Sequence, residues 1–122
     1  MTRYFISFND GDMTFPEEDM PAVGAAAHAV MAEAIEAGHW VFGEGFLGYA
    51  PRVVTAEGAV TDGPLVESNA HIGGFAILDL ESDEEANAWA ARFAEACRCS
   101  QEVRAIMPDP QQDLMTSRSN PN

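Results

Sequence analysis

The chain is poor in basic residues and in long apolar runs, and each shortage excludes a class of protein. Only six of its 122 residues are Lys or Arg, against twenty Asp or Glu, and the formal net charge is −14 at pH 7. Such a surface repels a nucleic-acid backbone or an anionic membrane, so we expect no direct binding to either. Charged, Gly and Pro residues interrupt every apolar stretch before the roughly 18 residues that a membrane helix needs. The N-terminus lacks the apolar segment and cleavage site of a signal peptide, so we expect a cytoplasmic protein.

Cysteine is also scarce and confined to one pair, Cys97 and Cys99. A disulfide between residues this close would be strained, so we expect reduced thiols, with Cys97 packed on a helix face. No second cysteine pair stands at zinc-site spacing, and His28, His39 and His71 follow no metal-binding pattern. The sequence therefore predicts no intrinsic metal. It also contains no glycine-rich phosphate loop and no serine nucleophile elbow, and it predicts no cofactor.

The hydrophobic pattern predicts strands and two helices. Branched and aromatic residues indicate strands over residues 3–8, 39–49, 73–80 and 101–107. Helical periodicity covers residues 20–37, and a second helix follows Ser82, which forms a Ser-x-x-Glu capping box with Glu85. Within the second strand, Gly43 and Gly45 indicate a bulge or a close backbone approach.

Two further segments complete the expected organisation. Residues 52–61 read as a hairpin around Glu57 and Gly58, closed by Asp-Gly-Pro at residues 62–64. After a domain of residues 1–108, residues 109–122 are polar and contain prolines, and we expect a loose tail there.

The order of these elements predicts an α+β fold of the ferredoxin-like type, βαββαβ with an inserted β-hairpin. Its two helices can cover only one face of the sheet. In the third main strand Phe75 and Ile77 point to one face, while Ala76 and Leu78 point to the other, so both faces are apolar. An uncovered apolar face of this size implies a partner, and we expect a homodimer that packs sheet against sheet.

Several motifs carry a resemblance to a known family. Asp62-Gly63-Pro64 ends the hairpin, Gly73-Gly74 precedes a strand, a Glu-Ala…Trp-Ala helix follows, and Glu102-Val103-Arg104 lies in the last strand. This pattern, together with AGHWVFGEGFL at residues 37–47, resembles the YCII-related family, and within it the DGPF-motif subgroup, over residues 3–108. The resemblance implies a dimeric α+β barrel. It also implies a His/Asp-centred site in some members and an association with alternative sigma factors in others.

The chain departs from the family pattern in three segments. Leu65 stands in place of the phenylalanine of the motif, Asn69 in place of a lysine, and Ala105 in place of a proline. A role for that lysine in holding an anion therefore cannot carry over to this chain.

His28 and Asp62 are the candidate catalytic residues. On a helical wheel His28 lies about 100° from the centre of the apolar stripe, at the boundary where a side chain can line a cleft. An imidazole there could carry a proton near neutral pH, and the alternative is a histidine at the edge of the core. Asp62 could orient that imidazole or act as a base, but an aspartate also opens turns without any chemical role.

Glu67, His71 and Arg104 are the candidate ligand-binding residues. Glu67 and His71 would face a cavity if the hairpin folded over the barrel mouth, and would otherwise lie in a solvated loop. Arg104 could receive a carboxylate ligand or pair with an acidic side chain.

Two functions stay open on this sequence. The first is a His/Asp acid–base enzyme that acts on a small, uncharged or weakly charged molecule in a cleft between helix and hairpin. The second is a non-catalytic ligand-binding or regulatory accessory module, for example one associated with a sigma factor.

Overall fold

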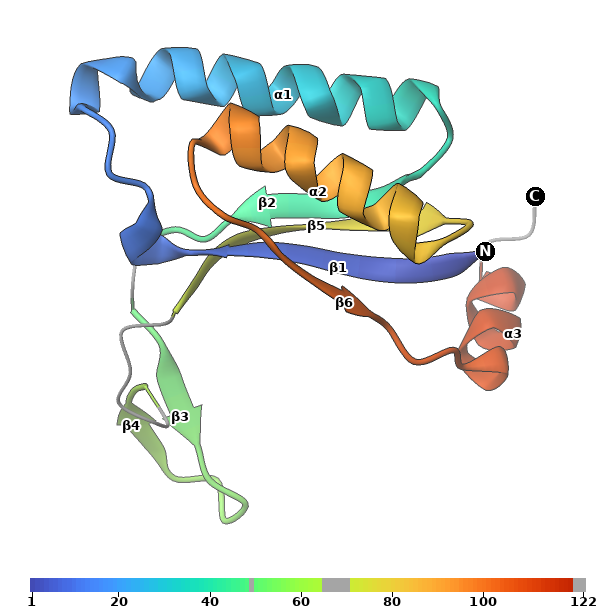
Figure 1. The fold of residues 1–122 in the computed structure, drawn as a ribbon. Coiled ribbons are helices and arrows are strands. Elements are labelled where there is room, and N and C mark those ends of the chain that lie inside the picture. The colour runs from blue at the N-terminus through green and yellow to red at the C-terminus, as the bar shows by residue number, and fades with distance from the viewer. Residues whose placement is uncertain (49, 65–70, 120–122) are drawn as a thin grey trace.

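The elements follow the expected order. The computed structural model describes residues 1–48, 50–64 and 71–119. Its strands and helices are β1 (Thr2–Asn9), α1 (Met20–Glu36), β2 (Trp40–Gly45), β3 (Arg52–Val54), β4 (Val60–Asp62), β5 (Ile72–Leu80), α2 (Asp83–Cys97), β6 (Glu102–Ala105) and α3 (Pro110–Ser119) (Figure 1). Two short 3-10 turns, Asp10–Asp12 and Glu17–Asp19, lead from β1 into α1.

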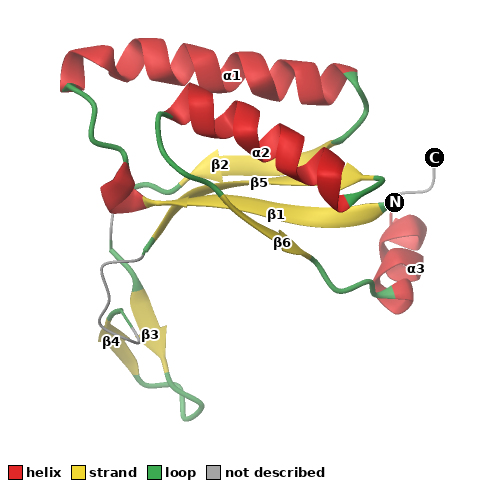
Figure 2. Cartoon of the chain, in the orientation of Figure 1, coloured by secondary structure: helices red, strands yellow, loops and turns green. Residues whose placement is uncertain are grey.

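The four long strands form one antiparallel sheet in the order β2-β5-β1-β6. Both α1 and α2 lie on the same face of this sheet, as Figure 2 shows. This is the ferredoxin-like βαββαβ arrangement predicted from the sequence. The inserted hairpin is present as β3 and β4, which pair with each other as a separate two-stranded sheet.

The expectation of a loose tail after residue 108 is wrong, because α3 forms there. Asp109 precedes the helix, and its Oδ1 accepts the backbone N–H groups of Gln111 and Gln112 at 3.1 and 3.2 Å. Pro110 is the first helical residue, where a missing N–H costs nothing. Aspartate followed by proline is therefore a helix start here, and the proline is not a sign of irregular chain.

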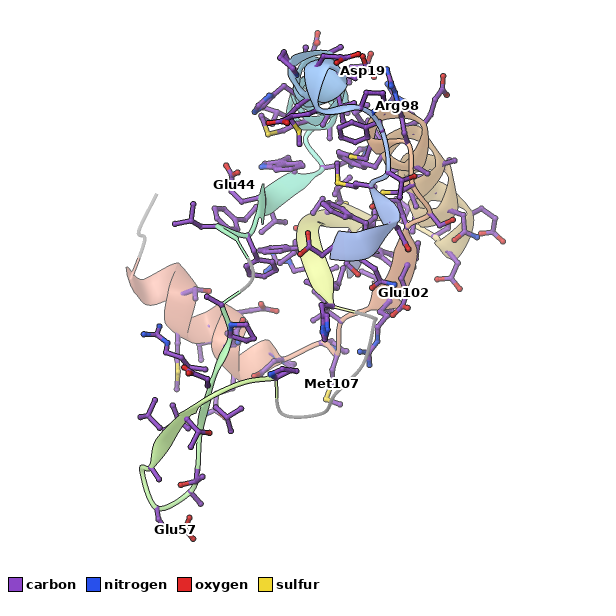
Figure 3. All side chains as sticks on the ribbon, turned by 90° about the vertical axis from the view of Figure 1, so that its left-hand side faces the viewer. Asp19, Glu44, Glu57, Arg98, Glu102 and Met107 are labelled. Atoms are coloured by element: carbon purple, nitrogen blue, oxygen red, sulfur yellow. The ribbon has the colours of Figure 1, made fainter. Side chains whose placement is uncertain are left out.

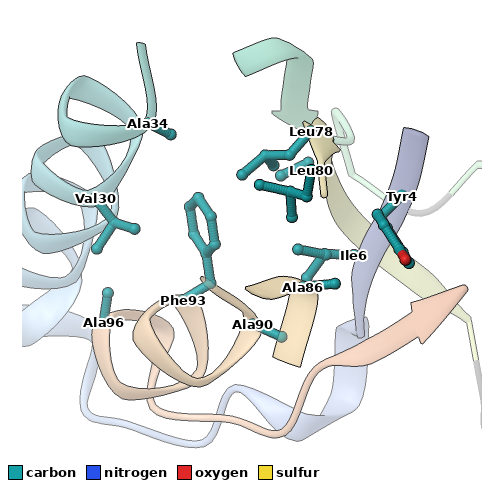
Figure 4. Packing of buried hydrophobic residues seen from close by; sticks show 11 residues of the cluster. Tyr4, Ile6, Val30, Ala34, Leu78, Leu80, Ala86, Ala90, Phe93 and Ala96 are labelled. Atoms are coloured by element: carbon teal, nitrogen blue, oxygen red, sulfur yellow. The ribbon is translucent and has the colours of Figure 1, made fainter. Parts of the chain in front are cut away.

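The core lies between the helices and the sheet (Figure 4). Ile6 of β1 and Leu78 and Leu80 of β5 are its most deeply buried large side chains. Alanines and one phenylalanine of the helices pack over them: Ala34, Ala86, Ala90, Phe93 and Ala96. The small alanine side chains let the helices approach the sheet closely, and burial of the apolar surface drives the packing.

The start of α2 confirms the Ser82 cap, and the carboxylate of Glu85 bonds one residue before that cap. Ser82 Oγ accepts the backbone N–H of Glu85 at 3.1 Å, and the Glu85 carboxylate accepts the backbone N–H of Glu81 at 2.9 Å. The helix thus begins directly after β5 and crosses back over the sheet.

The second face of the sheet, which we call the open face, carries an aromatic cluster. Phe5 and Phe75 stack with ring centroids 5.4 Å apart, and the rings of Phe42 and Phe46 lie 6.0 and 5.7 Å from that of Phe75. Phe42 and Phe46 are more than half exposed. This face is therefore apolar although neither α1 nor α2 covers it, as the two-sided pattern of β5 predicted.

Candidate functional site

A pocket of about 120 Å³ lies between α1, α2 and the sheet. Aromatic and small apolar side chains make most of its wall. We call it the helix–sheet pocket; its lining residues are Phe8, Ala27, His28, Met31, Trp40, Gly43, Glu44, Phe75, Ala76, Phe93, Cys97 and Gln101. Residues of α1, such as His28, and of β2, such as Gly43, therefore line the same pocket.

Two glycines shape the aromatic walls of this pocket. A Cβ added at Gly74 would lie 2.6 Å from the ring of Phe8, and one at Gly43 would lie 2.8 Å from the ring of Trp40. Each ring can therefore lie against the sheet only because the residue below it has no side chain. Gly74 of the Gly-Gly segment thus leaves room for the ring of Phe8, and Gly43 of the Gly-Glu-Gly segment leaves room for the ring of Trp40.

His28 is the pocket's imidazole. It is exposed on α1 and lines the pocket together with Met31, one turn further along the helix, so it stands at the mouth of the cavity. It makes no hydrogen bond or ion pair with any residue that the structure describes. The boundary position predicted from the helical wheel thus places His28 at a cavity, with both ring nitrogens available to a ligand.

Two other titratable residues line the pocket, Glu44 and Cys97. Glu44 is exposed on the edge strand β2, where Figure 3 labels it. Cys97 is buried, and burial raises the pKa of its thiol, so the thiol stays protonated at neutral pH. Gln101 adds an amide. No arginine is among the described residues that line this pocket, and the chain contains no lysine.

Asp62 does not meet His28 in this structure. It is the last residue of β4, opposite Arg52 of β3, and Figure 1 shows this hairpin on the side of the sheet away from α1. The N–H of Gly63 donates to the carbonyl of Pro51 at 2.8 Å, which closes the hairpin on itself. The Asp-Gly-Pro turn therefore directs Asp62 away from the helix–sheet pocket.

The three predicted ligand-binding residues also lie away from the pocket or outside the described residues. His71 precedes β5, and its carbonyl accepts the N–H of Asp10 at 2.7 Å. Arg104 lies on β6 opposite Phe5, at the margin of the open face. Glu67 lies outside the described residues.

Glu44 is a pocket-lining residue that was not among the candidates from the sequence. It stands between Gly43 and Gly45, and the sequence pattern assigns these glycines a backbone role only. The sequence does contain a signal for Glu44. It is a charged residue between two glycines, on a strand that directly follows a helix.

The described residues contain neither a metal cluster nor a membrane span. No group of three or more His, Cys, Asp or Glu side chains in residues 1–48, 50–64 and 71–119 is placed to hold a metal ion. No helix in the described part of the chain is long and apolar enough to cross a bilayer.

The sheet, its two helices and the pocket beneath them place the chain in the class of ferredoxin-like α+β proteins. Different members of this class have different functions. Within that class the chain belongs to the YCII-related domain family, whose model matches residues 3–108. No curated protein matches the chain.

One similar solved structure is that of 5-chloro-2-hydroxyhydroquinone dehydrochlorinase (TftG) from Burkholderia phenoliruptrix AC1100, in complex with 2,5-dihydroxybenzoquinone. The TM-score is 0.51 at 16% identity, over 89% of this chain and 97% of that chain. The likeness is one of fold. The chain therefore has the fold of a YCII-like dimeric α+β barrel, in agreement with the family resemblance of its motifs.

Proposed function

We propose that the helix–sheet pocket binds a small, uncharged molecule of about one ring and that His28 exchanges a proton with it. The observation that carries this proposal is the imidazole of His28 at the mouth of an otherwise apolar pocket, without a partner among the described residues. A histidine near neutral pH can both accept and donate a proton, and it needs an opposing polar group on the ligand.

The size and polarity of the pocket limit the ligand. An apolar cavity of about 150 Å³ holds benzene, and this pocket measures about 120 Å³. A charged ligand would lose its hydration without meeting an arginine or lysine of the described lining, and an anion would also lie near Glu44. The ligand expected is therefore one ring or a branched chain of similar size with a hydroxyl or carbonyl group. The ligand named with TftG, 2,5-dihydroxybenzoquinone, is also a single ring that carries hydroxyl and carbonyl groups.

In this proposal His28 acts without Asp62, because the hairpin holds Asp62 on the other side of the sheet. Glu44 is the acidic residue that lines the same pocket. The proton that His28 removes from a hydroxyl or an acidic C–H of the ligand would return to the same molecule or pass to water. This proton transfer needs no reactant besides the imidazole, the ligand and water.

We also propose that the protein is a homodimer joined through the open face. The support is the aromatic cluster around Phe75, whose members Phe42 and Phe46 are more than half exposed in the described chain. An exposed apolar patch of this kind marks an interaction site.

A second function, ligand binding without turnover, is favoured by the scarcity of polar groups in the pocket. His28, Glu44, Cys97 and Gln101 are its only polar or titratable residues among those described. The same experiment can separate the two functions, because an enzyme alters its ligand and a binding module returns it unchanged.

The test is a titration of the native protein with phenol, hydroquinone, cyclohexanol and benzoate, followed by the NMR signals of the histidine rings. We expect the neutral rings to shift the His28 signal and benzoate to leave it unchanged. His28→Gln should weaken binding, while His71→Gln, a matched change outside the pocket, should not. Tighter binding of benzoate, or shifts confined to other residues, would overturn the proposal. Mass spectrometry of the recovered ligand then decides between turnover and simple binding.

A further inference from the structure

Most of the exposed large hydrophobic side chains of the described residues belong to elements other than the two helices that cover the sheet. All but Met20 and Ile35, which belong to α1, lie in the sheet, its loops, the hairpin or the C-terminal segment: Met1, Val41, Phe42, Phe46, Leu47, Val54, Val60, Ile72, Met107, Leu114 and Met115. Figures 1 and 3 place the hairpin and α3 beyond the open face, on the side away from α1 and α2. The open face therefore lies between two projecting elements.

The hairpin is the element that most needs a partner. Each of its strands has three residues, and Figure 1 shows it extending away from the main sheet. Val54 and Val60 are cross-strand neighbours on one face of the hairpin and are 65% and 61% exposed. An isolated two-stranded hairpin is marginally stable in water, and exposed valines add to its cost. Packing against another surface would stabilise the hairpin and would bury its two exposed valines.

The charges on this side fit a second copy of the same chain. Arg3, Arg92 and Arg98 each form an ion pair with an acidic residue of their own chain. Arg52 of the hairpin and Arg104 at the margin of the open face form none with any described residue.

Glu44 and Glu102 are exposed at the two margins of that open face. A twofold axis through the face would bring these arginines of one copy near carboxylates of the other, as a self-complementary interface requires. The net charge of −14 acts against an anionic membrane and also between two copies of the chain, so the local pairs of arginine and carboxylate have to offset that repulsion in a dimer.

We propose that the β3–β4 hairpin is an exchanged arm, which reaches past the open face and packs Val54 and Val60 on a second copy of the chain. This inference rests on the proposed homodimer and adds the segment that holds it together. The arm lies on the opposite side of the sheet from the helix–sheet pocket, so its loss should weaken dimerisation and leave ligand binding by the free subunit intact.

The test compares two neighbouring substitutions on β4 by analytical ultracentrifugation. Val60→Asp places a charge beside the exposed Val54 on one face of the hairpin, and Thr61→Asp places the same charge beside Val53 on the other face. We expect Val60→Asp to raise the dimer dissociation constant at least about tenfold, and Thr61→Asp to change it less than about threefold. Equal effects of the two substitutions on the dimer dissociation constant would overturn the proposal that the hairpin is an exchanged arm.

Hydrogen exchange keeps the test decisive if Val60→Asp disturbs the hairpin itself. The N–H of Thr55, which donates to the carbonyl of Ala59 within the hairpin at 2.9 Å, should exchange slowly in the dimer and fast after dilution to monomer. Protection that is independent of concentration, or no protection in the dimer, would overturn the proposal. A wild-type chain that is monomeric at micromolar concentration would overturn the dimer and the arm together, while the ring-binding proposal would still be judged by its own NMR titration.

Discussion

The phenol of Tyr4 donates a 2.6 Å hydrogen bond to Oδ1 of Asp83, which ties β1 to the first turn of α2. Tyr4 is buried under that turn. The hydrogen bond to Asp83, together with burial and the negative charges of Asp83 and Glu84, raises the pKa of Tyr4 to about 12. An acidic group with a raised pKa in the folded state makes stability depend on pH at the alkaline end of the scale.

We expect the free energy of unfolding to fall between pH 10 and about 12. The unfolded chain loses the phenolic proton near pH 10, while the folded chain keeps it until about pH 12. The stabilisation by the neutral phenol is therefore complete below pH 10 and is lost as the pH rises through this range. Urea denaturation of wild type and Tyr4→Phe measures it, and the variant should show a shallower fall. Parallel pH curves for the two proteins would contradict this account.

Gly43→Ala should destabilise the protein far more than Gly45→Ala on the same strand. A Cβ at Gly43 would lie 2.5 Å from the carbonyl oxygen of Phe75 and 2.9 Å from the Cα of Ala76, and this backbone cannot move aside without disturbing the sheet. At Gly45 the nearest atom is 3.7 Å away.

We expect a loss of about 3 kcal/mol for Gly43→Ala, and a change within about 0.5 kcal/mol for Gly45→Ala. Urea denaturation of the three proteins provides the comparison. A small and equal effect of both substitutions would show that β2 can shift away from β5.

The sequence allowed most of the fold to be predicted, because the signals that place its elements are local. The Ser82–Glu85 box marks the start of a helix whatever the surroundings, and the alternation of Ala76 and Leu78 with Phe75 and Ile77 fixes both faces of β5. The helix α3 escaped prediction although its signal was also local. Asp109 before Pro110 is a good helix start, and the polar sequence around it concealed the helix.

The lining of the helix–sheet pocket could be predicted only in part, because it depends on where distant segments meet. The position of His28 at the edge of the apolar stripe could be predicted from the helix alone. The direction of the hairpin, which carries Asp62 away (Figure 1), has no periodic signal in the sequence. Glu44 pairs with Phe75 of β5 on the edge strand β2, where the margin of the open face adjoins the pocket, and sequence spacing cannot show that arrangement.

Ser82→Ala should cost about 1 kcal/mol of stability, because the backbone N–H of Glu85 loses its acceptor at the start of α2. The denaturation midpoint in urea should fall with an unchanged slope. Ser100→Ala, at an exposed serine between α2 and β6, is the matched control and should leave the midpoint unchanged. Equal midpoints for the two variants would mean that water replaces the serine hydroxyl at no cost.

Neither cysteine should react readily in the folded protein. Burial raises the pKa of Cys97, and burial together with the neighbouring Cys97 and Asp12 raises the pKa of Cys99 to about 11. Since the thiolate is the reactive form, a pKa about two units above normal reduces the reactive fraction of Cys99 roughly a hundredfold at pH 8.

The measurement is the rate of modification by dithiobis(nitrobenzoate) at pH 8, in buffer and in concentrated urea. We expect slow modification of both thiols in buffer and rapid modification of both in urea, where burial is lost. Cys97→Ser and Cys99→Ser assign each phase to its residue. A fast phase in buffer that disappears with Cys99→Ser would contradict the raised pKa. It would mean that the segment between α2 and β6 opens often enough to expose the thiol, a motion that would also open the Gln101 side of the helix–sheet pocket.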